Sequence, residues 1–115
     1  MATAPVTVVE TAAFIARAKG RMTEAERLAL IDGIARNPEC GDVIEGGGIR
    51  KLRFAVGGRG KSGGVRVIYY YHSEALPVFL LTVFAKRERD DLTQAEVNSL
   101  AKTVKAVPKS YGVKR

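Results

Sequence analysis

The chain of 115 residues is 46% hydrophobic and 27% charged, values that are typical of a soluble globular domain. No apolar run approaches the about 20 residues that a membrane span requires. We therefore expect one domain over residues 1–115 and no membrane association. The single cysteine, Cys40, excludes an internal disulfide, and the first residues lack the features of a secretory signal, so we expect a cytoplasmic location.

The net charge of +7 is concentrated in one part of the chain. Residues 1–49 hold 5 basic and 7 acidic residues, a net of −2, whereas residues 50–115 hold 14 basic and 5 acidic residues, a net of +9. Concentrated basic charge is typical of a protein that binds a phosphate-rich partner. The alternative is a solvated basic face without a ligand.

Residues 6–9 (VTVV) are mostly β-branched and predict a first strand, and residues 12–19 predict a short helix. Thr23 and Glu26 have the spacing of a capping box, in which each side chain bonds the main-chain N–H of the other residue. They predict the start of a second helix, which carries an amphipathic stripe and ends at the Asn-Pro pair of residues 37–38.

Residues 41–48 (GDVIEGGG) predict a glycine-rich turn. Three strands are predicted after it, over residues 49–55, 65–71 and 76–85. The first two alternate between two sets of side chains, as the two faces of a strand require. The third is apolar almost throughout, which indicates a central position in the sheet.

A second capping box, Thr93 and Glu96, predicts the start of the last helix. Pro108 is expected to end that helix and to leave residues 109–115 as a basic tail. The element order is then β-α-α-β-β-β-α. Strands joined by short turns pair antiparallel, and helices grouped before the strands favour an α+β fold. We expect a small antiparallel sheet of three to five strands, with helices packed mainly on one face.

The stretch GGRGKSGG, residues 57–64, is similar to a phosphate-binding P-loop, although Ala55 occupies the position of the first glycine. A P-loop lies between a strand and the N-terminus of a helix, which supplies the amides that hold the phosphates. Here two glycines and the run VRVIYYY follow, and that run predicts a strand. The stretch is therefore interpreted as a long hairpin loop.

Six cations lie within 17 residues, on two predicted strands and the loop that joins them. Alternation places Lys51 and Arg53 on one face of their strand, and antiparallel pairing can bring Arg66 opposite them. Like charges on neighbouring strands are destabilising unless an anion bridges them. This cluster predicts a phosphate site, and its members are Arg50, Lys51, Arg53, Arg59, Lys61 and Arg66.

Other reactive side chains do not build a site. His72 is the only histidine, and no cysteine or carboxylate cluster accompanies it, so we expect no metal and no cofactor. Cys40 has no nearby histidine that would activate it. Asp90 and Asp91 precede the last helix, whose N-terminus favours acidic residues. Among the tyrosines of residues 69–71, one side is expected to be buried while the other side can meet a base.

Three segments together resemble the RelE/ParE superfamily of bacterial type II toxins: RKLR, GKSGGVRVIYY and AKRERDDLT. The glycine-rich loop before the VRVIYYY strand is most similar to the HigB-like branch. The resemblance covers nearly the whole chain and implies an endoribonuclease that cleaves mRNA in the ribosomal A site. It also implies a neighbouring antitoxin, expected to be a small helix-turn-helix protein.

The residues that do the chemistry in this family are basic. Carried over by position, they fall on Lys51, Arg53, Arg66, Lys86 and Arg87. RNA is cut without a metal when its 2′-OH attacks the adjacent phosphate. A lysine crowded by cations loses its proton more readily, so Lys51, and Lys86 second, are the candidate bases. The arginines would stabilise or orient the phosphate, and Arg50, Arg59 and Lys61 would add RNA contacts.

One departure from the family pattern leaves two alternatives open. The best-known ribonuclease members have a tyrosine just after the KRER segment, where this chain has Thr93. The first alternative is therefore a ParE-like inhibitor of gyrase, which shares the fold without cleaving RNA. The second is an RNA-binding module without catalysis.

Overall fold

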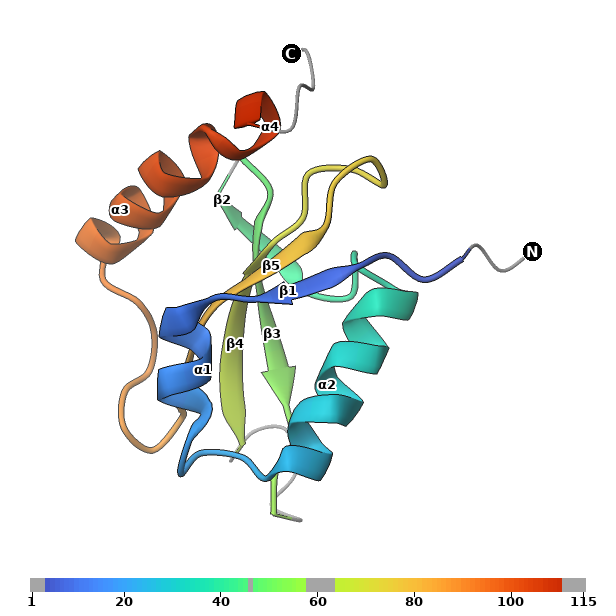
Figure 1. Ribbon diagram of the computed structural model, residues 1–115. Helices are drawn as coiled ribbons and strands as arrows, with labels where there is room; N and C mark the ends of the chain where they lie inside the picture. Colours follow the sequence, from blue (N-terminus) through green and yellow to red (C-terminus); the bar gives the residue numbers. More distant parts are fainter. Residues whose placement is uncertain (1–3, 46, 58–63, 111–115) are drawn as a thin grey trace.

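The computed structural model describes residues 4–45, 47–57 and 64–110 (Figure 1). Its elements, in chain order, are β1 (Val8–Glu10), α1 (Ala12–Ala18), α2 (Glu24–Arg36), β2 (Asp42–Glu45), β3 (Ile49–Phe54), β4 (Val65–Tyr70), β5 (Val78–Ala85), α3 (Gln94–Lys105) and α4 (Val107–Ser110). The expected α+β class is confirmed.

Both predicted capping boxes are present. The Thr23 hydroxyl accepts from the Glu26 N–H at 3.1 Å, and the Glu26 carboxylate accepts from the Thr23 N–H at 2.8 Å. Thr93 and Glu96 make the same reciprocal pair at the start of α3, at 3.1 and 2.7 Å. The two longest helices therefore begin where side chains satisfy main-chain donors that the helix leaves free.

The five strands form one sheet in the order β1-β5-β4-β3-β2. Strands β2, β3, β4 and β5 pair antiparallel in sequence, which confirms the predicted adjacency of the 65–71 and 76–85 strands. Strand β1 is an exception to the antiparallel expectation, because it pairs parallel to β5. The chain between them passes through two helices and three strands, so no hairpin imposes an antiparallel direction.

Strand β2 corrects the expected turn over residues 41–48. Asp42 and Val43 of β2 lie opposite Lys51 and Arg50 of β3, and a register irregularity follows between Val43 and Glu45. The β-branched residues Val43 and Ile44 favour a strand, although glycines flank them. The glycine-rich composition therefore marks the ends of a short edge strand rather than one continuous turn.

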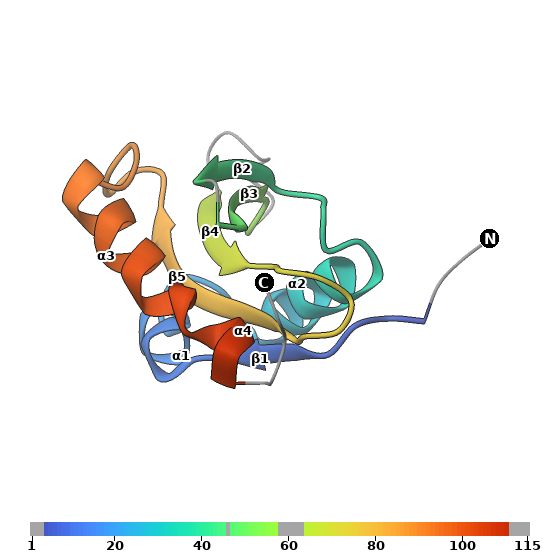
Figure 2. The same cartoon turned by 90° about the horizontal axis from the view of Figure 1, so that it is seen from above.

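Helices lie on both faces of the sheet, with α1 and α2 on one face and α3 on the other (Figure 2). Helices α1 and α2 pack through Phe14, Leu30 and Ile34 against the face that carries Val65, Val67 and Tyr69. Helix α3 contributes Val104 to a second cluster on the opposite face, which contains Ile49, Ile68, Tyr70, Leu81 and Phe84. The alternation predicted along β4 is therefore confirmed.

The C-terminal end also differs from the prediction. Pro108 is the second residue of the short helix α4, so the chain is helical as far as Ser110. Proline is tolerated in the first turn of a helix, because the N–H groups there have no intrahelical acceptor. Residues 111–115 of the expected basic tail lie outside the described residues.

The structure explains why the last residue of the GGRGKSGG stretch, Gly64, is a glycine. Strand β4 begins at Val65, which confirms that no helix follows this loop and excludes a P-loop. A Cβ atom on Gly64 would lie 2.1 Å from the carbonyl oxygen of Phe54, across the base of the hairpin. Only glycine therefore fits where β3 and β4 approach each other.

We predict that Gly64→Ala lowers the free energy of unfolding by roughly 1–3 kcal/mol, because the hairpin base must open to admit a methyl group. Gly33→Ala is the matched control. Gly33 lies in α2, and a methyl group there would meet no atom outside the helix backbone within 4 Å, so alanine should stabilise the protein by roughly 0.5–1 kcal/mol. Urea unfolding of both variants measures the difference, and equal stability of the two would contradict the steric argument.

Candidate nucleic-acid interface

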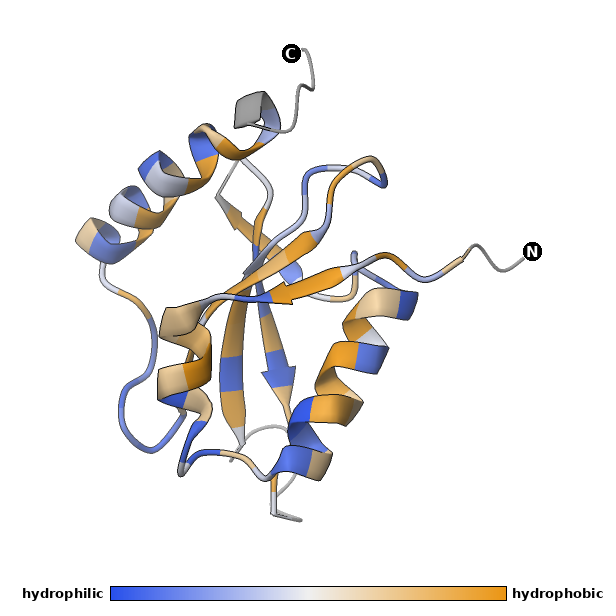
Figure 3. Ribbon diagram, in the orientation of Figure 1, coloured by the Kyte–Doolittle hydropathy of each residue, from blue (hydrophilic) through white to orange (hydrophobic). Residues whose placement is uncertain are grey.

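Pairing of β3 with β4 brings three predicted site residues onto one face of the sheet. Arg53 lies directly opposite Arg66, and Lys51 lies opposite Ile68. Because Ile68 belongs to the cluster beneath α3, all three cations lie on the α3 side of the sheet. We call Lys51, Arg53 and Arg66 the cation face. Figure 3 shows hydrophilic segments on β3 and β4 within an otherwise hydrophobic sheet.

The three members of the cation face differ in exposure. Arg53 is exposed, the Lys51 side chain is 25% exposed, and Arg66 is only 6% exposed. Arg66 donates from Nη1 to the carbonyl oxygen of Val65 at 3.4 Å, and its register partner on β5 is the buried Phe84. A ligand would therefore meet Arg53 first, with Arg66 lying beside it in the sheet.

A carboxylate on the segment after β5 contacts the cation face. Lys51 Nζ donates to Asp91 Oδ2 at 2.7 Å. This bond holds the pKa of the Asp91 carboxyl below its ordinary range. The sequence predicted Asp91 only as an acidic residue near a helix N-terminus, and it predicted that the neighbours of Lys51 are cations. The structure instead gives Lys51 a carboxylate partner, which removes part of the cation crowding on which its assignment as a base depended.

Arg89 is a second residue that sequence reasoning missed. Its guanidinium lies 5.3 Å from the centre of the Phe84 ring, and it forms an ion pair with Glu96. Its Nε also donates to the main-chain oxygen of Asp91 at 3.1 Å. Arg89 thus links the sheet, the segment between β5 and α3, and α3 itself. The sequence predicted the capping-box role of Glu96, but it did not predict the ion pair between Glu96 and Arg89.

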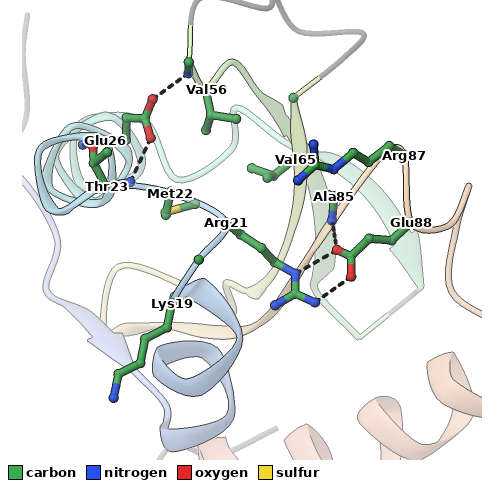
Figure 4. Close-up of a pocket in the computed structure, with 13 residues that line it drawn as sticks. Lys19, Arg21, Met22, Thr23, Glu26, Val56, Val65, Ala85, Arg87 and Glu88 are labelled. Carbon is green, nitrogen blue, oxygen red and sulfur yellow. Dashed lines mark hydrogen bonds and ion pairs between the residues drawn. The ribbon is translucent and has the colours of Figure 1, made fainter.

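The structure does not gather the last two predicted catalytic residues onto the cation face. Lys86 pairs with Asp90 at 2.6 Å within its own segment. Arg87 is exposed and lines a cavity of about 560 Å³ at the end of the sheet, on the side of α1 and α2 (Figure 4). Strand alternation ends with β5, so it does not determine where the side chains of residues 86 and 87 point.

Arg50, one of the predicted RNA contacts outside the catalytic set, also lies away from the cation face. Arg50 has the opposite strand parity to Lys51, and its Nη1 donates to the carbonyl oxygens of Glu39 and Gly41, at 3.1 and 2.7 Å. Arg50 therefore stabilises the turn before β2 and does not belong to the cation face. Arg59 and Lys61 lie outside the described residues.

The other reactive side chains have structural neighbours. His72 stacks on Tyr70, with ring centres 6.3 Å apart, and the Cys40 sulfur lies 3.7 Å from the Tyr69 hydroxyl. Tyr69 and Tyr70 are both buried, so the expectation that one side of this run can meet a base fails for Tyr70, which lies in the same apolar cluster as Val104 of α3. Within residues 4–45, 47–57 and 64–110, no group of histidine, cysteine and acidic side chains is arranged to hold a metal ion.

A model of one protein family, described as the RelE toxin of the RelE / RelB toxin-antitoxin system, matches residues 8–111. The chain belongs to the RelE toxin family. Membership makes it the toxin of a toxin-antitoxin system and implies a cognate antitoxin as its partner. In the part of the chain that the structure describes, no helix of this RelE-family toxin is long and apolar enough to cross a membrane.

Two glutamates, Glu88 on the segment after β5 and Glu96 of α3, make ion pairs that depend on pH. Arg21 lowers the pKa of Glu88 from 4.5 to about 2, and the Ala85 N–H contributes by donating to the same carboxylate. Arg89 lowers the pKa of Glu96 to about 2, helped by the Thr93 N–H. Since the folded-state pKa values lie below 4.5, both pairs stabilise the fold above that pH and are lost as the pH falls toward 2.

We predict that the free energy of unfolding falls as the pH is lowered from 5 to about 2.5, because these carboxylates must then take up protons. Glu88→Gln should reduce stability at pH 7 and make the acid dependence shallower. Glu39→Gln is the control, since in the described part of the chain its side chain makes no ion pair. Urea unfolding across this pH range tests the prediction, and superimposable profiles for Glu88→Gln and the parent would contradict it.

Proposed function

We propose that this toxin is a ribosome-dependent mRNA endonuclease of the HigB-like branch, acting in the cytoplasm on mRNA held by the ribosome. The observation that supports this most directly is the register that sets Arg53 opposite Arg66, with Lys51 on the same face. Two guanidiniums in directly opposite positions repel each other, and a phosphate between them would relieve that repulsion. An inhibitor that contacts only protein does not need such a site.

The proposed reaction needs no metal. The 2′-oxygen of one nucleotide attacks the adjacent phosphorus while a base accepts the 2′-OH proton. The bond from phosphorus to the 5′-oxygen breaks, and that oxygen takes up a proton. The products are a 2′,3′-cyclic phosphate and a 5′-OH end. The protein must stabilise the extra negative charge on the phosphorane and manage two proton transfers.

Each residue has a proposed role in this reaction. Arg53 and Arg66 would stabilise the phosphorane, and Arg53 would make the first contact because it is exposed. Lys51, whose ammonium is paired with Asp91, would contact a phosphate oxygen, and Lys86 is the candidate for proton transfer at the 2′-oxygen. Arg87 would orient the RNA where it passes the end of the sheet. The cognate antitoxin is expected to be a helix-turn-helix protein.

We predict that Arg53→Ala and Arg66→Ala each reduce mRNA cleavage about 10²–10³-fold, since each removes a preorganised contact to the developing charge. Growth arrest on expression should be lost with cleavage. The measurement maps new mRNA 5′ ends in cells and tests those ends for a free 5′-OH. Because Arg66 is nearly buried, the exposed Arg53 gives the test that does not depend on core packing.

Arg36→Ala is the matched control for these variants. Arg36 is an exposed arginine of α2, paired with Asp32, on the side of the sheet away from the cation face. It should leave cleavage and toxicity unchanged. If Arg53→Ala, Arg66→Ala and Lys51→Ala all stay toxic and the parent produces no new 5′ ends, the ribonuclease proposal is wrong.

RNA binding provides a separate prediction. The logarithm of the binding constant should fall with the logarithm of salt concentration, with a slope of roughly −0.7 for each phosphate contacted on single-stranded RNA. Arg53→Ala should make that slope shallower by about one contact, whereas Arg36→Ala should leave it unchanged. Fluorescence titration of a short RNA at several salt concentrations gives the slopes, and a salt-independent affinity would exclude a phosphate surface.

One observation favours the gyrase-inhibitor alternative. The Thr93 hydroxyl accepts from the Glu96 N–H as the cap of α3, so it serves the helix at the position where ribonuclease members have a tyrosine. A toxin that lacks this group and cleaves no RNA would act by binding protein, as a gyrase inhibitor does, or by binding RNA without cleaving it. Inhibition of gyrase supercoiling by the purified toxin, in the absence of mRNA cleavage, would favour this alternative.

A further inference from the structure

The connector between β5 and α3, residues 86–93, reaches the cation face through one carboxylate. Asp91 accepts from Lys51 at 2.7 Å, although the two residues are 40 positions apart in the chain. The Lys51 side chain is 25% exposed and that of Asp91 53%, so most of the Lys51 side chain is covered and its ammonium is paired with a half-exposed carboxylate. This ion pair ties the connector to the cation face.

Asp91 makes two further hydrogen bonds, one through its carboxylate and one through its main-chain oxygen. Its Oδ1 accepts from the Leu92 N–H at 2.8 Å, so both carboxylate oxygens are engaged. Its main-chain oxygen accepts from Arg89, whose guanidinium is fixed by Glu96 of α3 and by the ring of Phe84. The carboxylate therefore has a defined position relative to both α3 and the sheet.

We propose that Asp91 is a positioning residue, which holds the Lys51 ammonium at a fixed point beside Arg53 for contact with an RNA phosphate. The inference rests on the proposed function. An ammonium has three N–H donors, so the bond to Asp91 leaves donors for a phosphate oxygen. A free lysine would lose side-chain entropy on binding RNA, whereas Lys51 has lost it already on folding.

The same carboxylate opposes RNA binding by its charge, and this opposition makes the proposal testable. Removing the charge should release Lys51 from its fixed position and, at the same time, reduce repulsion of RNA. The cleavage rate and the RNA affinity should therefore change in different directions. A purely structural role would lower both together, in proportion to the loss of folded protein.

Asp91→Asn is the decisive variant, because asparagine keeps the shape of the side chain and removes its charge. Single-turnover cleavage at saturating mRNA-programmed ribosomes should slow by up to about 100-fold, while affinity for the same ribosomes stays equal or increases. Asp32→Asn is the matched control, since Asp32 also pairs with a cation but lies on α2. It should change neither quantity.

A second measurement does not depend on cleavage. Carbon relaxation of the Lys51 ε-methylene in the free protein should report a restrained side chain in the parent and a mobile one in Asp91→Asn. Equal mobility in the two proteins, or cleavage by Asp91→Asn at the parental rate, would overturn the proposal. A parent that cleaves no mRNA, with Lys51 restrained only when Asp91 is present, would contradict the ribonuclease function and support the positioning contact.

Discussion

The register between β3 and β4 is the constraint on which the rest of the interface depends. It sets Arg53 against Arg66 across the ladder and brings Lys51 to the same face. A slip of one residue would turn the side chains of a strand to the opposite face of the sheet. Gly64 helps to hold this register, because only a residue without a side chain fits against the carbonyl of Phe54 at the base of the hairpin.

Apolar packing makes the same register costly to change. Along β4, Val65, Val67 and Tyr69 enter the core beneath α1 and α2, while Ile68 and Tyr70 enter the core beneath α3. Both faces of this strand are therefore buried, and a shift of one residue in either direction would exchange the side chains of the two faces. Arg66 is placed within an apolar strand for this reason, and its low exposure follows from the central position of β4 in the sheet.

Much of the fold could be predicted from local patterns. Capping boxes located the starts of α2 and α3, and alternation assigned the two faces of β4. The parallel pairing of β1 could not be predicted, because no turn chemistry links it to β5. Strand β2 was missed because glycines surround its few β-branched residues.

The candidate site was predictable only where strand periodicity applies. Lys51, Arg53 and Arg66 lie on strands, and the structure brings them together. Arg87, Arg89 and Asp91 follow the last strand, where side-chain direction depends on long-range contacts. The bond between Lys51 and Asp91 leaves no trace in residue spacing, since neither helix nor strand periodicity relates two positions 40 residues apart.

The two edges of the sheet are short. Strand β1 has three residues and β2 has four, so each edge presents few unpaired N–H and C=O groups to another chain. Long exposed edges are templates for strand addition and for aggregation between copies. A toxin acts when it is free of its antitoxin, at a time when that partner does not shield its surface. Short edge strands therefore favour a toxin that does not aggregate while it is free of its antitoxin and that remains able to reach its target.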